Sequence, residues 1–222
     1  MAITLYYHPL ASFCHKVLIA LYEHGTAFDK RMIDLGVEEE RAELAAIWPI
    51  GKFPVIRDHD RKRNVPESST IIEYLDHFYP GAAALLPQDW EAAHEVRLWD
   101  RVFDNHVQGP VQAIVLDRLT GSKRDMARER AALATAYRMI EERMAPREWI
   151  AGDAFSMADC AAAPALFYAA TLEPFPAGAR HLEAYFERLM ARPSVRRVLD
   201  EAKPYFSMYP FAEAIPARFR QD

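Results

Sequence analysis

The sequence is poor in cysteine and glycine. Its 222 residues include two cysteines, Cys14 and Cys160, which excludes a disulfide framework and favours a reducing compartment. The eight glycines form neither G-x-G-x-x-G nor a P-loop, so neither nucleotide phosphate motif is present. The spacing of His8, Cys14 and His15 matches no standard zinc pattern, and H-E-x-x-H and C-x-x-C are missing. We therefore expect no metal.

The chain also lacks an excess of positive charge and a long apolar run. It carries 32 acidic and 27 basic residues, a net charge of −5, so we expect no nucleic acid and no anionic membrane as partner. The longest apolar run, residues 160–172, is shorter than the roughly 20 residues of a membrane helix and contains Pro164. The first residues, MAITLYYHPL, do not resemble a signal peptide, and we predict a cytoplasmic protein.

Strand and helix patterns alternate in the first third of the chain. Ser12 can cap the first helix, and Gly25 is suited to end it. Expected strands are 3–8, 27–33, 53–57 and 64–65, and expected helices lie between Ser12 and Gly25 and over residues 38–47 and 67–78. This order, β-α-β-α-β-β-α, predicts a small mixed sheet covered by helices.

Helical patterns dominate after a short Pro-containing stretch. They span residues 90–119, 122–144, 155–170, 179–191 and 194–202, and Pro110 is expected to kink or break the first of them. We predict an α/β domain over residues 1–79, a linker over 80–88 and an all-α domain over 89–222. The aromatic stretch 204–211 is expected to pack as a tail on the helical domain or to act as a flap over a substrate pocket.

Residues 11–17 lie where a strand leads into a helix. Free N–H groups and the helix dipole at such a position stabilise an anion, and a thiol there drops from a pKa of about 8.5 to about 3.5–7.5. Cys14 is thus a candidate reactive thiol. The alternative is structural, with Ser12 as a helix cap and Cys14 as a small buried residue.

Phe53 and Pro54 begin a predicted strand. A cis bond between them would present the Phe53 backbone N–H and C=O to a peptide-like ligand. The alternative is a trans proline at a sheet edge. Glu67 and Ser68 precede a predicted helix, where a carboxylate can accept from an ammonium group and a helix start can bind a carboxylate. This pair could hold an α-amino acid head group, or Ser68 or Ser69 could simply cap the helix.

In this order and spacing the motifs resemble the cytosolic glutathione transferase family, of the serine type or a related bacterial class. The resemblance covers nearly the whole chain, and its most specific parts are Phe53-Pro54 and Glu67-Ser68. A further match is the segment 155–159, in which Ser156 would cap a buried helix, Asp159 would reach back to it and Phe155 would act as a staple.

The resemblance implies a thioredoxin-like first domain that binds glutathione as cosubstrate without a metal. The Phe53 backbone would pair with the cysteinyl part, Glu67 and Ser68 would hold the γ-glutamyl end, and Lys52 would lie near the glycyl carboxylate. A homodimer is implied, with an apolar pocket between the domains for a hydrophobic electrophile. Its candidate residues are His8, Trp99, Phe103, His106 and Val107.

One position departs from the family pattern. Many serine-type members carry their serine five residues before the basic residue matched here by Lys16, and that position is Ala11. The group that would activate the thiol therefore stays open between Ser12, Cys14 and backbone N–H groups near Phe13.

The leading hypothesis is a detoxifying glutathione transferase that activates the thiol as a thiolate. The alternatives are a glutathione-dependent thiol-disulfide reductase that uses Cys14 and a catalytically weak binding module, which Ala11 motivates.

Overall fold

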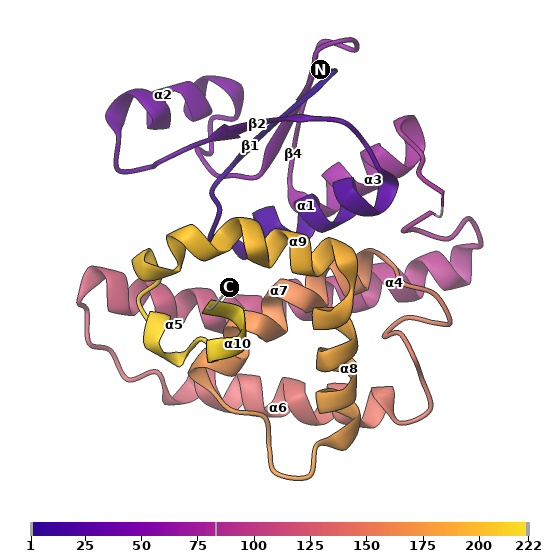
Figure 1. Cartoon of the computed structure of the whole chain (residues 1–222), viewed down its shortest axis with the longest axis vertical. Coiled ribbons are helices and arrows are strands. Elements are labelled where there is room, and N and C mark those ends of the chain that lie inside the picture. Colours follow the sequence, from indigo (N-terminus) through magenta and orange to yellow (C-terminus); the bar gives the residue numbers. More distant parts are fainter. Residues whose placement is uncertain (1, 83, 221–222) are drawn as a thin grey trace. The chain divides into compact units, whose positions relative to one another are not determined.

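The computed structural model describes residues 2–82 and 84–220 (Figure 1). Residue 83, inside the expected linker of residues 80–88, lies outside the described residues, as do residues 1, 221 and 222. Contacts within the chain define two compact units, one reaching to Leu86 and the other beginning at Pro87. Each unit is described by itself.

The first unit has the expected order of strands and helices. Its elements are β1 (Ile3–Tyr7), α1 (Ser12–His24), β2 (Asp29–Met32), α2 (Glu38–Ile47), β3 (Val55–Asp58), β4 (Arg63–Pro66) and α3 (Ser68–Phe78). The sheet has the order β2-β1-β3-β4, with β1 parallel to β2 and the other neighbours antiparallel. The predicted α/β class of this part is confirmed.

Helices cover both faces of this sheet. Tyr6 and Val55 are paired across β1 and β3 and pack with Leu44 of α2. Leu5 and Ile56 are the next pair along and therefore point to the opposite face. On that side α3 packs against β3, β4 and α1. Figure 1 shows α2 on one side of the strands and α1 and α3 on the other.

The sequence predicts the end of α1 correctly but not its start. Gly25 ends the helix as expected, with a φ of 65° and its N–H bonded to the carbonyls of Leu21 and Tyr22. The expected cap at Ser12 is wrong. Ala11 is the cap residue, and Ser12 is the first helical residue, because Ala11 has an extended backbone and its carbonyl accepts the first N–H groups of the helix.

The second unit is mostly helical. Its α-helices are α4 (Trp90–Val102), α5 (Gly109–Thr120), α6 (Ala127–Met144), α7 (Met157–Leu172), α8 (Arg180–Ala191), α9 (Pro193–Ala202) and α10 (Ala217–Arg220). Between α4 and α5 the chain forms a π-helix, η1 (Phe103–Gln108). Two 3₁₀ helices, η2 (Lys203–Met208) and η3 (Ala212–Ala214), lie near the end of the chain. The predicted all-α class is confirmed.

The expected helix 90–119 is interrupted just before Pro110. The Gly109 N–H bonds to the carbonyl of Asp104, five residues earlier, which is the π-helical pattern. Proline has no N–H and its ring crowds the carbonyl four residues back, so the regular ladder cannot continue through this position. The chain nevertheless stays helical from Trp90 to Thr120, so Pro110 coincides with a change of hydrogen-bond pattern, and a break at this position is not observed.

The expected helix 122–144 begins five residues later, at Ala127. The residues before it terminate α5 instead. Gly121 is in the left-handed conformation, the Ser122 N–H bonds to the Asp117 carbonyl, and the Arg124 N–H bonds to the Asp117 carboxylate at 3.0 Å. Because these N–H groups already have acceptors outside α6, the helix starts after them.

The capping motif at the start of α7 is present. The Asp159 carboxylate accepts the Ser156 N–H at 2.9 Å and the Ser156 hydroxyl at 2.8 Å, and it also accepts from Ile150 N–H and the Tyr185 hydroxyl. The Phe155 ring packs edge-on against Trp149, with ring centroids 5.2 Å apart. This motif therefore serves the folding of the helical unit.

Within the described ranges 2–82 and 84–220, no helix combines the length and the apolar character needed to cross a membrane.

Candidate functional site

Three predicted segments meet at one end of the sheet. Tyr6, near the end of β1, pairs with Val55, the first residue of β3, and Val55 pairs with Pro66, the last residue of β4. The chain that follows β1, the chain that precedes β3 and the chain that follows β4 therefore emerge together. These are the 8–11 loop, the Phe53-Pro54 turn and the Glu67-Ser68 pair.

The Phe53-Pro54 peptide bond is cis, so the alternative of a trans proline is wrong. Strand pairing of β3 begins at Val55, so Phe53 lies outside the hydrogen-bonded ladder and its backbone is not used by the sheet. Lys52 is exposed directly before it. A backbone N–H and C=O at a strand end, next to a lysine, can bind an extended peptide that carries a carboxylate.

Glu67 has an unusual backbone. Its φ is 67°, a left-handed value that residues with side chains rarely adopt, and its side chain is exposed. Such outliers are found disproportionately at binding sites. Ser68 follows as the first residue of α3 and is buried. The alternative that Ser68 or Ser69 caps α3 is wrong, because the cap position belongs to Glu67.

The start of α1 offers donors. Ser12 and Phe13 are the first two helical residues, whose N–H groups lie ahead of the intrahelical ladder that begins with Cys14 and His15 bonding to the Ala11 carbonyl. Ala11, at the cap position, has no hydroxyl and makes no side-chain cap bond. An anion at this position would be stabilised by backbone N–H groups and by the helix dipole.

Of the two interpretations of Cys14, the small buried residue is confirmed, and the lowered pKa of a reactive thiol is wrong. Its side chain is fully buried, and burial raises the pKa of the Cys14 thiol to about 12, although a hydrogen bond with the His8 backbone acts in the opposite direction. The sequence predicts a lowered pKa because Cys14 lies in the first turn of α1. The residue faces the core, however, where a thiolate would be desolvated.

Lys16, the basic residue five positions after Ala11, is buried. It is 1% exposed, and its ammonium donates to the Ser69 hydroxyl at 2.9 Å. This bond joins α1 to the first turn of α3, beside Ser68. The position of Lys16 one turn after Ser12 is visible in the sequence, but its partner lies 53 residues away.

The loop between β1 and α1 is held by hydrogen bonds at several points. The His15 ring Nε2 donates to the Pro9 carbonyl at 2.6 Å, and the Ala11 N–H donates to the His8 carbonyl at 3.1 Å. The Leu10 N–H donates to Nδ1 of His8 at 3.2 Å. The His8 ring also stacks on Phe53, with centroids 5.8 Å apart. The structure thus brings His8 to the Phe53 turn.

The other residues suggested for an electrophile pocket lie in the helical unit. Trp99, Phe103 and Val107 are buried, and the rings of Trp99 and Phe103 are 6.3 Å apart. His106 is exposed on η1. Arg143 donates to the Glu95 carboxylate, and its guanidinium lies 5.2 Å from the Trp99 ring centroid. These contacts fix Trp99 but do not by themselves define a substrate site.

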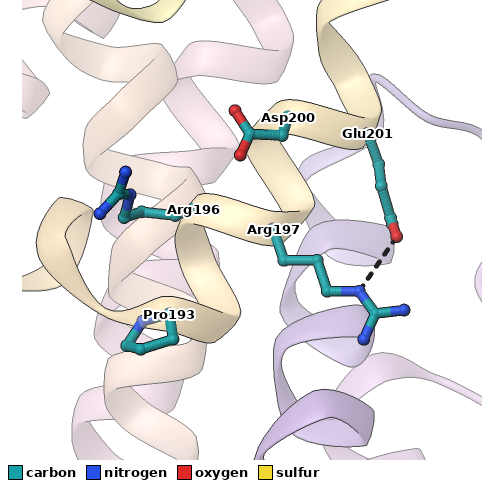
Figure 2. A pocket seen from close by; sticks show the side chains of 5 residues that line it. All are labelled: Pro193, Arg196, Arg197, Asp200 and Glu201. Carbon is teal, nitrogen blue, oxygen red and sulfur yellow. Dashed lines mark hydrogen bonds and ion pairs between the residues drawn. The ribbon is translucent and has the colours of Figure 1, made fainter.

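Figure 2 shows an open recess on the surface of α9. Its lining residues are Pro193, Arg196, Arg197, Asp200 and Glu201. Arg197 Nε donates to Glu201 Oε1 at 3.2 Å, and the recess contains two guanidinium and two carboxylate groups. Their charges balance, and none of the predicted glutathione-binding residues lines the recess. We therefore place the candidate site at the end of the sheet.

Among the residues that the structure describes, no group of three or more His, Cys, Asp or Glu side chains is placed to hold a metal ion.

The sheet, its cis-proline turn and the helical second unit define a thioredoxin-like domain joined to an all-α domain. Each of the two domains matches the model of a known protein family. Residues 5–83 match the model of the glutathione S-transferase N-terminal domain, and residues 102–193 match that of the C-terminal domain.

Individual proteins match over most of their length. The Arabidopsis thaliana glutathione S-transferase F10 is 28% identical over 214 residues, covering 89% of this chain and 96% of that protein. A glutathione S-transferase from Methylobacillus flagellatus, solved with glutathione bound, is 25% identical with a TM-score of 0.77, covering 88% of this chain and 98% of that one. An epsilon-class enzyme from Musca domestica has a TM-score of 0.84 at 16% identity, covering 95% of this chain and 98% of that one, and shows the fold alone.

This chain belongs to the cytosolic glutathione transferase family.

Proposed function

We propose that the protein binds reduced glutathione at the end of the sheet and activates its thiol as a thiolate for attack on an electrophilic small molecule. The observation that carries this proposal is the convergence of the Phe53-Pro54 turn, the Glu67-Ser68 pair and the start of α1, which follows from the register of β1, β3 and β4. Family membership supports glutathione as the cosubstrate.

Each part of the tripeptide has a complementary group. The Phe53 backbone, outside the ladder, pairs with the cysteinyl residue, and Lys52 lies near the glycyl carboxylate. Glu67 accepts from the γ-glutamyl ammonium. The hydroxyl and N–H of Ser68, at the start of α3, bind the γ-glutamyl carboxylate.

The thiolate lies at the start of α1 in this proposal. Ser12 is the proposed side-chain partner of the sulfur, together with backbone N–H groups at Phe13. These donors favour the ionised thiol, and binding holds it close to the electrophile. The sulfur then uses its electron pair to form a bond to carbon while the leaving group departs with its own bonding pair. The electrophile binds at an apolar site. The protein assembles as a homodimer in the cytoplasm.

The reductase alternative requires a reactive Cys14, and full burial of a thiol whose pKa is raised to about 12 argues against it. The binding-module alternative rests on Ala11, which supplies no hydroxyl at the cap of α1. It predicts glutathione binding without turnover, so assays with several electrophiles separate it from the proposed transferase.

Calorimetric titration with reduced glutathione tests the proposed site. We expect wild-type protein to bind and Glu67→Ala to weaken binding by about 10- to 100-fold, because a charge-assisted hydrogen bond to the ammonium is lost. Glu142→Ala, the same change at an exposed position of α6, is the matched control and should bind as wild type does. Equal affinity of the Glu67 and Glu142 variants would contradict the proposed site.

A further inference from the structure

The His8 imidazole lies where the three site segments meet. It directly follows β1, its side chain is half-buried, and its ring stacks on Phe53 with an interplanar angle of 18°. Phe53 is the residue whose backbone is assigned to the cysteinyl part of glutathione in the proposed function. His8 is therefore adjacent to the place where that residue's sulfur would lie.

The hydrogen bonds of the loop determine where the imidazole carries its proton. The Leu10 backbone N–H donates to Nδ1 of His8 at 3.2 Å. Since a backbone N–H can only donate, Nδ1 presents its lone pair and the ring proton is on Nε2. The Ala11 N–H, bonded to the His8 carbonyl, fixes the backbone that carries the ring. The result is an oriented Nε2–H donor.

The surroundings keep this ring neutral. Burial lowers the pKa of the His8 imidazole below its ordinary value, and the negative charge of Asp34 opposes that shift. The Cys14 thiol, which contacts the His8 backbone, has a raised pKa and stays uncharged. At neutral pH His8 is thus a hydrogen-bond donor through Nε2 and is not a cation.

We infer that His8 is a further catalytic residue, whose Nε2–H donates a hydrogen bond to the sulfur of bound glutathione and stabilises the thiolate. This inference rests on the proposed function, because it requires glutathione at the Phe53 turn. It supplies a second side-chain donor beside Ser12 in a chain whose Ala11 has no hydroxyl. The thiol proton leaves to solvent, His8 keeps its own proton, and the sulfur retains the electron pair that later forms the bond to carbon.

Three substitutions of His8 distinguish the effect of losing the hydrogen-bond donor from the effect of losing the imidazole ring. His8→Phe keeps an aromatic ring against Phe53 but has no donor. His8→Asn keeps an acceptor near Nδ1 for the Leu10 N–H but does not reach the Nε2 position. His8→Gln places an amide N–H group near the position of Nε2 and so keeps a donor.

The readout is the pKa of the thiol in bound glutathione, followed by ultraviolet absorbance of the thiolate as the pH is varied. Removing one charge-assisted hydrogen bond should raise this pKa by about one to two units in His8→Phe and His8→Asn. In His8→Gln it should stay within about half a unit of wild type. Binding of S-methylglutathione, whose sulfur cannot ionise, should change little in all three variants.

The outcomes separate this inference from the proposed function. If wild type binds no glutathione, both are overturned. If wild type binds glutathione with a lowered thiol pKa and both donor-free variants do the same, only the role of His8 is overturned. An equal rise in all three variants would also overturn it, because the loss would then follow the imidazole packing and not the donor. Circular dichroism establishes that each variant is folded, and either donor-free variant is sufficient for the test.

Discussion

At the residue scale, burial acts in opposite directions on His8 and Cys14, which lie in neighbouring parts of the same segment. It lowers the pKa of the His8 imidazole and raises the pKa of the Cys14 thiol. The cause is the same in both cases, since a charged imidazolium and a charged thiolate both lose hydration. Both side chains are therefore neutral near pH 7, and in the proposed function the sulfur that ionises is that of glutathione.

Cys14 should consequently resist alkylation in the native protein. With both cysteines buried and the Cys14 pKa raised to about 12, we expect iodoacetamide at neutral pH to add no adduct over a period that fully labels a free thiol. Mass spectrometry of the intact chain measures this. The same reagent in denaturant should add two adducts, and this serves as the control. Rapid labelling of Cys14 in the native state, with loss of activity, would favour the reductase alternative.

Some residues of the proposed site are easier to recognise in the sequence than others. Phe53-Pro54 and Glu67-Ser68 can be recognised because each pair has a local signature at the end of a strand or the start of a helix. The burial of Lys16 cannot be recognised in this way, because it depends on Ser69 from a distant segment. The sequence leaves Cys14 open between a reactive thiol and a small buried residue, because the side-chain direction within the first turn of α1 depends on the final packing.

At the element scale, Asp58 joins β3 to the second half of α3. Its carboxylate is fully buried and accepts from the hydroxyls of Tyr74 at 2.7 Å and Tyr79 at 2.6 Å, and from the Arg61 N–H at 2.9 Å. Burial alone would raise the pKa of the Asp58 carboxyl. The hydrogen bonds and the charge of Arg61 outweigh burial, and the pKa is lowered. Since Phe53 and Glu67 lie just before the other ends of β3 and α3, this contact helps to orient the proposed site.

This lowered pKa predicts how stability depends on pH. The folded state binds the Asp58 proton more weakly than the unfolded state, so the contribution is complete above the unfolded pKa of about 3.9 and is lost as the pH falls through the lower folded pKa. Asp58→Asn should reduce the free energy of unfolding by about 1–3 kcal/mol at pH 7, and by less near pH 3. Urea unfolding at both pH values measures this.

Asp60→Asn, which removes the same charge from an exposed neighbouring position, is the control and should change stability by under about 0.5 kcal/mol. A loss in Asp58→Asn that is equal at pH 7 and pH 3 would show that the carboxylate charge is not responsible.

The presence and order of α1, α2 and α3 are well predicted from periodicity, although the expected caps of α1 and α3 are each one residue or more from the observed ones. Their boundaries fail where a residue serves a neighbouring element. Residues 122–126 have helical character in sequence, but Ser122 and Arg124 donate to Asp117 and so terminate α5. The sequence predicts only a kink or break at Pro110 and not the π-helix η1, because the five-residue hydrogen-bond step has no signature in sequence.

At the scale of the whole molecule, the two units differ in what their residues contribute to the proposed binding and to stability. The first unit carries all of the proposed glutathione-binding residues. The second unit includes its own stabilising devices, among them the capping motif of α7 and the packing of the chain that follows α9. Phe206 stacks on Phe167 at 6.0 Å, and the Tyr209 hydroxyl bonds to Thr171 at 2.9 Å. The prediction that residues 204–211 pack on the helical domain is confirmed by these contacts.

This packing predicts unequal effects for two neighbouring substitutions. Phe206 is 4% exposed, so we expect Phe206→Ala to lower the free energy of unfolding by about 3–5 kcal/mol. Met208 lies on the same 3₁₀ helix but is 58% exposed, so we expect Met208→Ala to lower the free energy of unfolding by less than about 0.5 kcal/mol. Thermal or chemical unfolding measures both. If the two variants were equally stable, residues 204–211 would not be part of the packed helical unit in solution.

The ionisation of bound glutathione tests the central claim most directly. Wild-type protein is saturated with reduced glutathione, and the thiolate absorbance is followed as the pH is raised. We predict a thiol pKa at least about one unit below that of free glutathione, because donors at the start of α1 stabilise the thiolate. Glutathione that is bound but ionises with its free-solution pKa would contradict the account, since the site would then hold the tripeptide without activating it.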